Sequence, residues 1–246
     1  MWTAWALRTG SSRVDQSMLT YLEGAGEQVV IPHVMILLRG EATVLVDTGF
    51  GAPEEIAAAY PQELWRSETQ DPVRLLAELG VAPGDVDVVV HTHLHYDHVG
   101  NNHLVPGATK VAQRSELEYA AEPDVPLMRR EYFTPHCGFP PQFDASDVTA
   151  IEGDHSLLPG LELLALPGHT PGSQGLLVQT GAGALCYPGD LVMVEENMRE
   201  LTPVGLHTDL SAAERSRRKV ADLGASVVPA HDMRIFKSGD IQELTP

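Results

Sequence analysis

The chain of 246 residues is long enough for one large domain with a buried core, and 43% hydrophobic and 20% charged residues are ordinary values for a globular protein. Its 34 acidic and 16 basic residues give a net charge of −18, which disfavours nucleic-acid binding, because phosphate backbones are bound by basic surfaces. No window reaches the ~20 apolar residues of a membrane span, and the first ten residues do not resemble a signal peptide. We therefore expect one cytoplasmic domain over residues 1–246 that binds neither nucleic acid nor membrane.

The first half of the chain predicts short strands separated by short helices. The strands are apolar and rich in β-branched residues, and we expect the first to be interrupted by Pro32, because proline cannot donate to a sheet. One helix has Asp71 as its N-cap, Pro72 at its first position and Gly80 after its end. The expected strands are residues 28–38, 42–46 and 86–90, and the expected helices are 53–60, 72–79 and 114–121.

Residues 122–146 contain many prolines and aromatic side chains but no periodic pattern, so we expect an irregular loop that forms a lid or a pocket wall. Strands are expected again at residues 161–166, 175–179, 184–187 and 226–228, with a helix at 211–223 before the last. Paired strands followed by strands that alternate with helices favour an α/β fold in which two packed sheets have helices outside.

The main chemical signal is the run His93–His98, with the sequence His-Leu-His-Tyr-Asp-His, which directly follows a predicted buried strand. His93 and His95 are two residues apart and project from the same side of an extended chain, and a turn would bring Asp97 and His98 next to them. Imidazole and carboxylate groups suit Zn²⁺, and also iron, manganese or cobalt. A surface histidine patch is the alternative interpretation.

Three later turns each place one metal-ligand type after a predicted strand. Gly and Pro surround His169, Pro188-Gly189 precedes Asp190, and Pro229-Ala230 precedes His231. Turns built from proline and glycine are rigid and can hold a side chain at a fixed angle. Together with the histidine run, these strand ends predict one metal site at an edge of the fold.

These motifs resemble the metallo-β-lactamase superfamily, including the strand end Leu45–Gly49. The resemblance implies an αββα sandwich of two mixed sheets flanked by helices, with the site at the open edge of the sheets. It further implies two divalent metal ions, most often zinc, and a role for Asp47 in ordering the loop beneath them. The implied ligands are His93, His95 and His169 for one metal and Asp97, His98 and His231 for the other, with Asp190 bridging. His91 is expected to be a strand residue, and no function is predicted for His33, His103, His136 or His155.

Two metals about 3.5–4 Å apart can share a hydroxide, which would attack a substrate carbonyl at neutral pH. Asp97 is then the first candidate to pass on the proton, and Asp190 is the second. An aspartate at position 190 disfavours true β-lactamases, and histidine at position 95 disfavours the redox members of the superfamily.

Within the superfamily the chain is most similar to N-acyl homoserine lactonases, through residues 15–18 and 29–32, Asp47-Thr48-Gly49 and His98–Asn101. These enzymes carry a tyrosine three residues after the bridging aspartate, where this chain has Met193. A thioether cannot donate a hydrogen bond, so Tyr96, Tyr132 or His207 would have to replace the hydroxyl. The expected pocket residues are Met18, Met193, Tyr132, Phe139 and His207.

We therefore predict a lactonase that acts on a small molecule. The first alternative is hydrolysis of another activated carbonyl compound, such as a thioester, lactam or cyclic amide. The second is a metal-binding protein without enzymatic activity. A homodimer formed through Trp2 and Trp5 is also considered.

Overall fold

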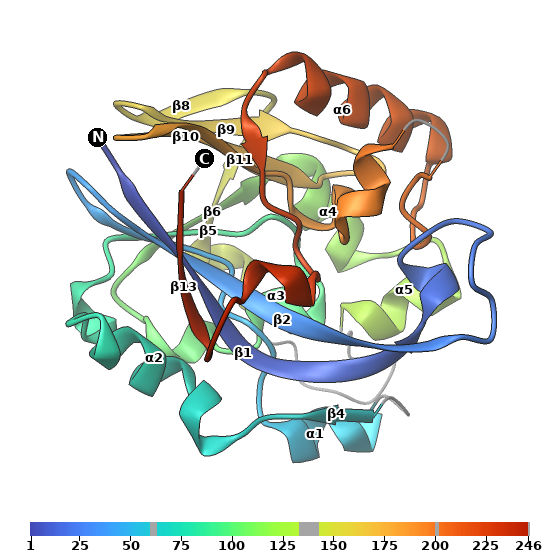
Figure 1. Ribbon diagram of the computed structural model, residues 1–246, viewed down its shortest axis with the longest axis horizontal. Helices are drawn as coiled ribbons and strands as arrows, with labels where there is room; N and C mark the ends of the chain where they lie inside the picture. Colours follow the sequence, from blue (N-terminus) through green and yellow to red (C-terminus); the bar gives the residue numbers. More distant parts are fainter. Residues whose placement is uncertain (60–62, 133–142, 200–201, 246) are drawn as a thin grey trace.

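Two β-sheets packed face to face form the centre of the protein, and helices cover their outer faces (Figure 1). The computed structural model describes residues 1–59, 63–132, 143–199 and 202–245. The larger sheet has the strand order β13-β1-β2-β3-β5-β6-β7, with β4 also paired to β1, and the smaller sheet has the order β12-β11-β10-β9-β8. Both sheets contain parallel and antiparallel pairs. The predicted αββα sandwich is thus confirmed.

The elements have the following bounds. The helices are α1 (Pro53–Ala59), α2 (Pro72–Glu78), α3 (Tyr96–Val99), α4 (Arg114–Ala121), α5 (Pro126–Glu131) and α6 (Leu210–Asp222). The larger sheet contains β1 (Thr3–Asp15), β2 (Gln28–Arg39), β3 (Thr43–Val46), β4 (Glu63–Trp65), β5 (Val88–Val90), β6 (Thr109–Gln113), β7 (Val148–Ile151) and β13 (Ile241–Leu244). The smaller sheet contains β8 (His155–Leu158), β9 (Leu161–Ala165), β10 (Gln174–Thr180), β11 (Gly183–Tyr187) and β12 (Ser226–Val227).

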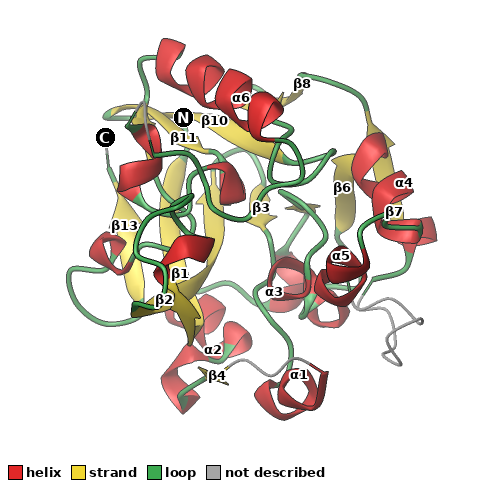
Figure 2. Cartoon of the chain, turned by 90° about the vertical axis from the view of Figure 1, so that its right-hand side faces the viewer, coloured by secondary structure: helices red, strands yellow, loops and turns green. Residues whose placement is uncertain are grey.

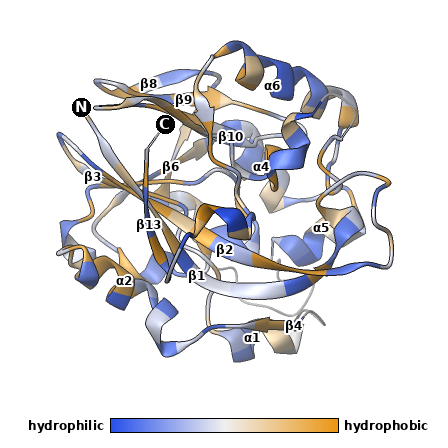
Figure 3. Ribbon diagram, viewed as in Figure 1, coloured by the Kyte–Doolittle hydropathy of each residue, from blue (hydrophilic) through white to orange (hydrophobic). Residues whose placement is uncertain are grey.

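Residues 34–38 of β2 are all apolar, because this part of the strand is buried on both of its faces. Ile36 lies between the sheets in the same core as Leu163 of β9, whereas Leu37 points the other way and packs in a cluster with Leu75 of α2. Successive side chains of a strand point to opposite faces, so a strand covered on both sides reads as a continuous hydrophobic run. Figure 2 shows α6 outside the smaller sheet and α1 and α2 on the opposite side of the molecule. In Figure 3, hydrophobic residues follow the strands and hydrophilic ones are frequent on α6.

The expected interruption at Pro32 is wrong, since β2 runs through this residue and pairs it with Ser11 of β1. Strand β3 pairs only with residues 36–39 of β2, so Pro32 has no strand on its other side. Proline lacks a backbone N–H, but at such an edge no neighbouring strand would accept a hydrogen bond from it, so the sheet loses no hydrogen bond. The carbonyl of Pro32 accepts a hydrogen bond from His231 instead, which brings this stretch of β2 to the candidate site.

The irregular loop expected over residues 122–146 is wrong for Pro126–Glu131, which form α5. Pro126 stands at the start of this helix, where its missing N–H and its fixed φ angle are tolerated. Residues 133–142, including Phe139, lie outside the described part of the chain. The role of this region as a lid or pocket wall remains a prediction.

Trp2 belongs to the core between the sheets. Its side chain is 3% exposed, and its Nε1 donates to the carbonyl of Pro159 at 2.9 Å. The proposed contribution of Trp2 to a dimer is therefore wrong, because the ring is covered within its own chain. Trp5 is half-buried and packs beside the cluster that contains Leu37. The homodimer itself remains a prediction. Within the described residues, no helix has the length and apolar character needed to cross a bilayer.

We expect the substitution Gly100→Ala to destabilise the fold. The N–H of Gly100 donates to the carbonyl of Gly49 at 2.9 Å, and an added Cβ would fall on the backbone of Gly51. Backbone cannot move aside as a flexible side chain can, so we expect the free energy of unfolding to decrease by about 1–3 kcal/mol. Urea denaturation measures this change, with Gly107→Ala as the control, because nothing lies within 4 Å of its Cβ. Equal stability of the two variants would contradict the expectation.

Candidate metal centre

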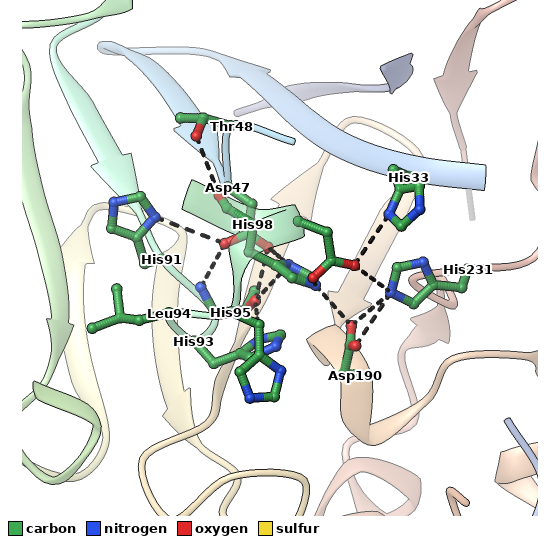
Figure 4. A network of polar contacts seen from close by, with 12 residues as sticks. His33, Asp47, Thr48, His91, His93, Leu94, His95, His98, Asp190 and His231 are labelled. Carbon is green, nitrogen blue, oxygen red and sulfur yellow. Dashed lines mark hydrogen bonds and ion pairs between the residues drawn. The ribbon is translucent and has the colours of Figure 1, made fainter. Parts of the chain in front are cut away.

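Four segments that follow strands bring histidine and aspartate side chains together at one edge of the two sheets (Figure 4). The run His93–His98 follows β5, and the turn with His169 follows β9. Asp190 follows β11, and His231 follows β12. Each of the five histidines is at most 4% exposed, and the side chains of Asp190 and Asp97 are 5% and 13% exposed. Seven side chains of metal-ligand type therefore share one buried region.

The first group consists of His93, His95 and His169, each of which offers a ring nitrogen within 4.8 Å of the others. The Nε2 atom of His169 lies 3.2 Å from Nε2 of His93 and 3.1 Å from Nδ1 of His95. Burial, followed by the nearby charge of His98, holds the pKa of His93 well below its usual value, and burial does the same for His95. Neutral imidazoles whose nitrogens converge are the donor set of a zinc site.

The second group consists of Asp97, His98, Asp190 and His231. Oδ1 of Asp190 lies 3.3 Å from Nε2 of His98 and 3.2 Å from Nε2 of His231. Oδ2 of Asp97 lies 3.9 Å from Nε2 of His231. Asp190 also reaches the first group, because its Oδ2 is 3.6 Å from Nε2 of His169. This carboxylate therefore faces both groups, as a bridging ligand must.

Three buried polar atoms of these groups lack a hydrogen-bond partner among the described residues: Nε2 of His95, Nε2 of His98 and Oδ1 of Asp190. Buried polar atoms are almost always paired, so these three indicate a missing partner. Two of these atoms, Nε2 of His98 and Oδ1 of Asp190, lie 3.3 Å apart in the second group. The donor set and its unpaired atoms thus fit bound divalent metal ions.

The charges of the second group also fit a cation. Although burial opposes it, the carboxylates of Asp190, Asp97 and Asp47 hold the pKa of His98 well above its usual value. Burial likewise opposes ionisation of Asp190, but His231 and His98 keep its pKa well below the usual range. A metal ion binds the unprotonated nitrogen of an imidazole, so metal binding at Nε2 of His98 competes with protonation of that nitrogen.

Asp47 lies directly beneath the second group and orients His98. Its carboxylate accepts hydrogen bonds from Nδ1 of His98 at 2.8 Å and from the N–H and hydroxyl of Thr92 at 2.8 and 2.7 Å. The bond to Nδ1 leaves Nε2 of His98 pointing at the site. His91 is fully buried beside Asn102 and lies outside both groups.

We expect Asp47→Asn to weaken metal binding by about 10–100-fold, because partners that orient a ligand histidine contribute that much affinity. Asparagine tolerates the positive φ of 58° found at this position, so the backbone is expected to persist. Competition with a chromophoric chelator measures the affinity. The exposed Asp147→Asn is the control, and equal affinities of the two variants would contradict the role of Asp47.

Glu116 of α4 is a buried carboxylate that sequence reasoning missed. It is fully buried and accepts four hydrogen bonds, from the N–H of Leu94 (3.0 Å), the hydroxyl of Tyr132 (2.7 Å), the hydroxyl of Thr170 (2.6 Å) and the N–H of Gly172 (3.2 Å). Burial raises its pKa, and the four donors oppose that shift. Glu116 therefore joins the loop of His93 and His95 to the turn of His169. The sequence shows only a glutamate early in a predicted helix, without a sign of its partners.

A cavity opens beside the two groups, and His95, Asp97, His169, Asp190 and His231 contribute to its lining. Its apolar wall consists of Val14, Met18, Leu19, Ile31, Met193 and Leu206. Met18 and Met193 were among the expected pocket residues, whereas Val14, Ile31, Leu206 and the polar residues His33 and Glu131 were not.

Two other expected pocket residues, Tyr132 and His207, are absent from the described lining of this cavity. The ring of Tyr132 packs edge-on against His95, 4.7 Å between centroids, and its hydroxyl donates to Glu116. His207 lies 2.8 Å from the carbonyl of Val204 through Nδ1. Of the candidate donors for a substrate, Tyr96 is the one that lines the cavity.

Comparison with known proteins agrees with this architecture. The family model described as the metallo-beta-lactamase superfamily matches residues 29–231. An N-acyl homoserine lactonase of Bacillus cereus is 29% identical over 249 residues, which cover 95% of this chain and 91% of that protein. The N-acyl homoserine lactonase AttM of Azorhizobium caulinodans is 30% identical over 248 residues, with 92% and 91% covered.

A solved structure of an N-acyl homoserine lactone hydrolase, with the product N-hexanoyl-L-homoserine bound at its catalytic metal centre, superimposes with a TM-score of 0.80. It is 25% identical to this chain, and 94% of each chain is covered. The family match over most of the chain and the similarity of fold and length lead to one conclusion. The chain belongs to the metallo-β-lactamase superfamily, as one of its metal-dependent hydrolases.

Proposed function

We propose that this chain hydrolyses a lactone, either an N-acyl homoserine lactone or a related cyclic ester, at a site that holds two divalent metal ions. The observation that carries the proposal is the pair of donor groups that meet at Asp190 beside a cavity with an apolar wall. The similarity to lactonases supports the substrate class.

In this proposal, His93, His95 and His169 hold one metal, and Asp97, His98 and His231 hold the other, with Asp190 shared. Zinc is the first choice, and iron, manganese or cobalt suit the same ligands. Such a metal pair polarises a carbonyl and lowers the pKa of water to about 7. Because the ligands come from both sheets, we infer one catalytic domain over residues 1–246.

Asp97 is the residue proposed to move the proton. Its carboxylate lines the cavity, and the side chain is 13% exposed, so it can reach a substrate. Ring opening of a lactone breaks the acyl–oxygen bond and adds water, and the departing alkoxide oxygen must receive a proton. Asp97 can take a proton from the attacking water and deliver it to that oxygen, and Asp190 is the alternative. The apolar wall offers space for an acyl chain.

Acid release across a panel of substrates tests this function. Zinc-loaded protein of measured metal content is mixed with lactones of increasing acyl length, thioesters and β-lactams, and a pH indicator reports the acid. We expect lactones to be opened by the wild type and not by His169→Ala, which lacks one ligand of the first group. Turnover of a thioester or a lactam alone would favour the alternative metallohydrolase function. Absence of turnover on all substrates with both metals bound would favour a metal-binding protein without catalysis.

We expect Met193→Tyr to increase turnover of N-acyl homoserine lactones. Met193 lines the cavity and cannot donate a hydrogen bond, whereas a tyrosine hydroxyl can. One hydrogen bond contributes about 1 kcal/mol, which corresponds to about a fivefold higher kcat/KM. Met193→Phe is the matched control, because it adds the ring without the hydroxyl. Equal effects of both variants would show that ring volume and not the hydroxyl matters.

A further inference from the structure

His33 of β2 lies in the cavity wall, beside Asp97 and His231 of the second group. It is 2% exposed, and its ring packs edge-on against His231, 5.4 Å between centroids, and against Phe50 at 4.9 Å. Figure 4 shows His33 next to His231, at the end of the cluster opposite His91. The superfamily resemblance assigns His33 no function.

Both ring nitrogens of His33 have a partner. Nδ1 lies 3.1 Å from Oδ2 of Asp97, and Nε2 lies 2.9 Å from Oγ of Ser12 on β1. An ionised carboxylate only accepts hydrogen bonds, so Nδ1 is the nitrogen that carries the hydrogen toward Asp97. Nε2 of the neutral ring then accepts from the hydroxyl of Ser12. This arrangement fixes the tautomer and the direction of the ring.

The same contacts separate two roles that His33 could have. His33, Asp97 and His231 offer ligand atoms within 4.8 Å of one another, so His33 could in principle bind the metal. A ligand nitrogen needs a free lone pair that faces the site. In His33 the nitrogen near the site donates to Asp97, and the other faces Ser12. The contacts therefore favour a residue that acts through Asp97.

Strand β2 supports the second group at two consecutive residues. The carbonyl of Pro32 accepts from Nδ1 of His231 at 2.9 Å, which directs Nε2 of His231 to the site. The next residue, His33, holds Oδ2 of Asp97. The hydrogen bond restrains rotation of the carboxylate and leaves Oδ1 on the side of His98, 3.7 Å from its Nε2.

We propose that His33 is a positioning residue that fixes the carboxylate of Asp97 for proton transfer to the leaving group. The proposal rests on the proposed hydrolytic function, in which Asp97 moves the proton. His33 itself does not touch the reacting atoms; it limits the orientations of the group that does.

Two substitutions at position 33 test the proposal as a matched pair. The amide nitrogen of asparagine can occupy the place of Nδ1 and donate to Asp97, whereas that of glutamine reaches the place of Nε2, next to Ser12. We expect His33→Gln to lower kcat about 10–100-fold with both metals retained, and His33→Asn to stay within about threefold of the wild type. Ser12→Ala removes the support of the ring from the other side and is expected to give an intermediate loss of kcat.

Metal analysis and the visible spectrum of the cobalt(II)-substituted protein provide a readout that does not require turnover. We expect two cobalt ions in each variant and a changed spectrum in His33→Gln that His33→Asn restores. Loss of one metal in both variants would overturn the proposal by making His33 a ligand. If both variants lost the same fraction of kcat and showed the same changed spectrum, His33 would be a packing residue only. That result would also overturn the proposal. If the wild type opens no substrate, the proposed function fails, while the spectra still decide whether His33 positions Asp97.

Discussion

Replacing Asp190 with asparagine is expected to lower kcat/KM about 1,000-fold or more and, at the proposed site for two metals, to remove one metal ion. Asp190 is the carboxylate that faces both groups of donors, with 3.2 and 3.3 Å to His231 and His98 and 3.6 Å to His169. An amide carries no negative charge to hold two cations near each other, and a lost metal removes several kcal/mol of transition-state stabilisation.

Metal content and kcat/KM are measured on the same preparation, with the exposed Asp222→Asn on α6 as the control. We expect the control to bind two metals and to retain its activity. Two tightly bound metals in Asp190→Asn, together with activity close to that of the wild type, would rule out a bridging role for Asp190.

Replacing Glu116 with leucine is expected to lower the free energy of unfolding by about 3 kcal/mol or more. Four donors, on Leu94, Tyr132, Thr170 and Gly172, would lose their acceptor in a buried region. Each buried donor without a partner costs about 1–3 kcal/mol, although relaxation keeps such costs from adding fully. The loop that carries His93 and His95 and the turn that carries His169 would also lose the connection that Glu116 makes between them.

Urea denaturation of metal-free protein measures the loss, because bound metal would otherwise add its own stabilisation. Glu116→Gln keeps the size of the side chain and is expected to be less destabilised. The exposed Glu118→Gln on the same helix is the control. A stability of Glu116→Leu within about 0.5 kcal/mol of that control, the usual range for surface substitutions, would show that the network contributes little.

Local sequence patterns were sufficient to predict those helices and strands whose start and end signals lie within the element itself. The helix with Asp71 as N-cap was expected at residues 72–79 and is observed at Pro72–Glu78, with the carboxylate of Asp71 accepting from the N–H of Arg74. Apolar runs located most central strands, because strands buried on both faces contain few polar residues. These elements favoured two packed sheets with helices outside, and the resemblance to the metallo-β-lactamase superfamily implied the αββα sandwich.

Strand β1 was missed for a physical reason. After the short apolar run of residues 4–7 it contains polar residues such as Thr9, Ser11 and Ser12, which are all buried, so most of the strand lacks both an apolar run and a clear alternation. These side chains are stabilised by partners on other segments, for example the carbonyl of His33 for the hydroxyl of Thr9. Such pairings depend on contacts that no local window contains.

Residue types and their spacing were enough to identify the candidate metal ligands, because four strand ends each carry histidine or aspartate in turns. Which of these side chains meet depends on the packing of the two sheets. Asp190 is placed between two groups, His33 is placed against Asp97, and Glu116 joins two loops that are far apart in the chain. Residue type and spacing report the chemistry that a side chain can perform. Distance and burial depend on how the sheets pack, and they decide which chemistry is available at the site.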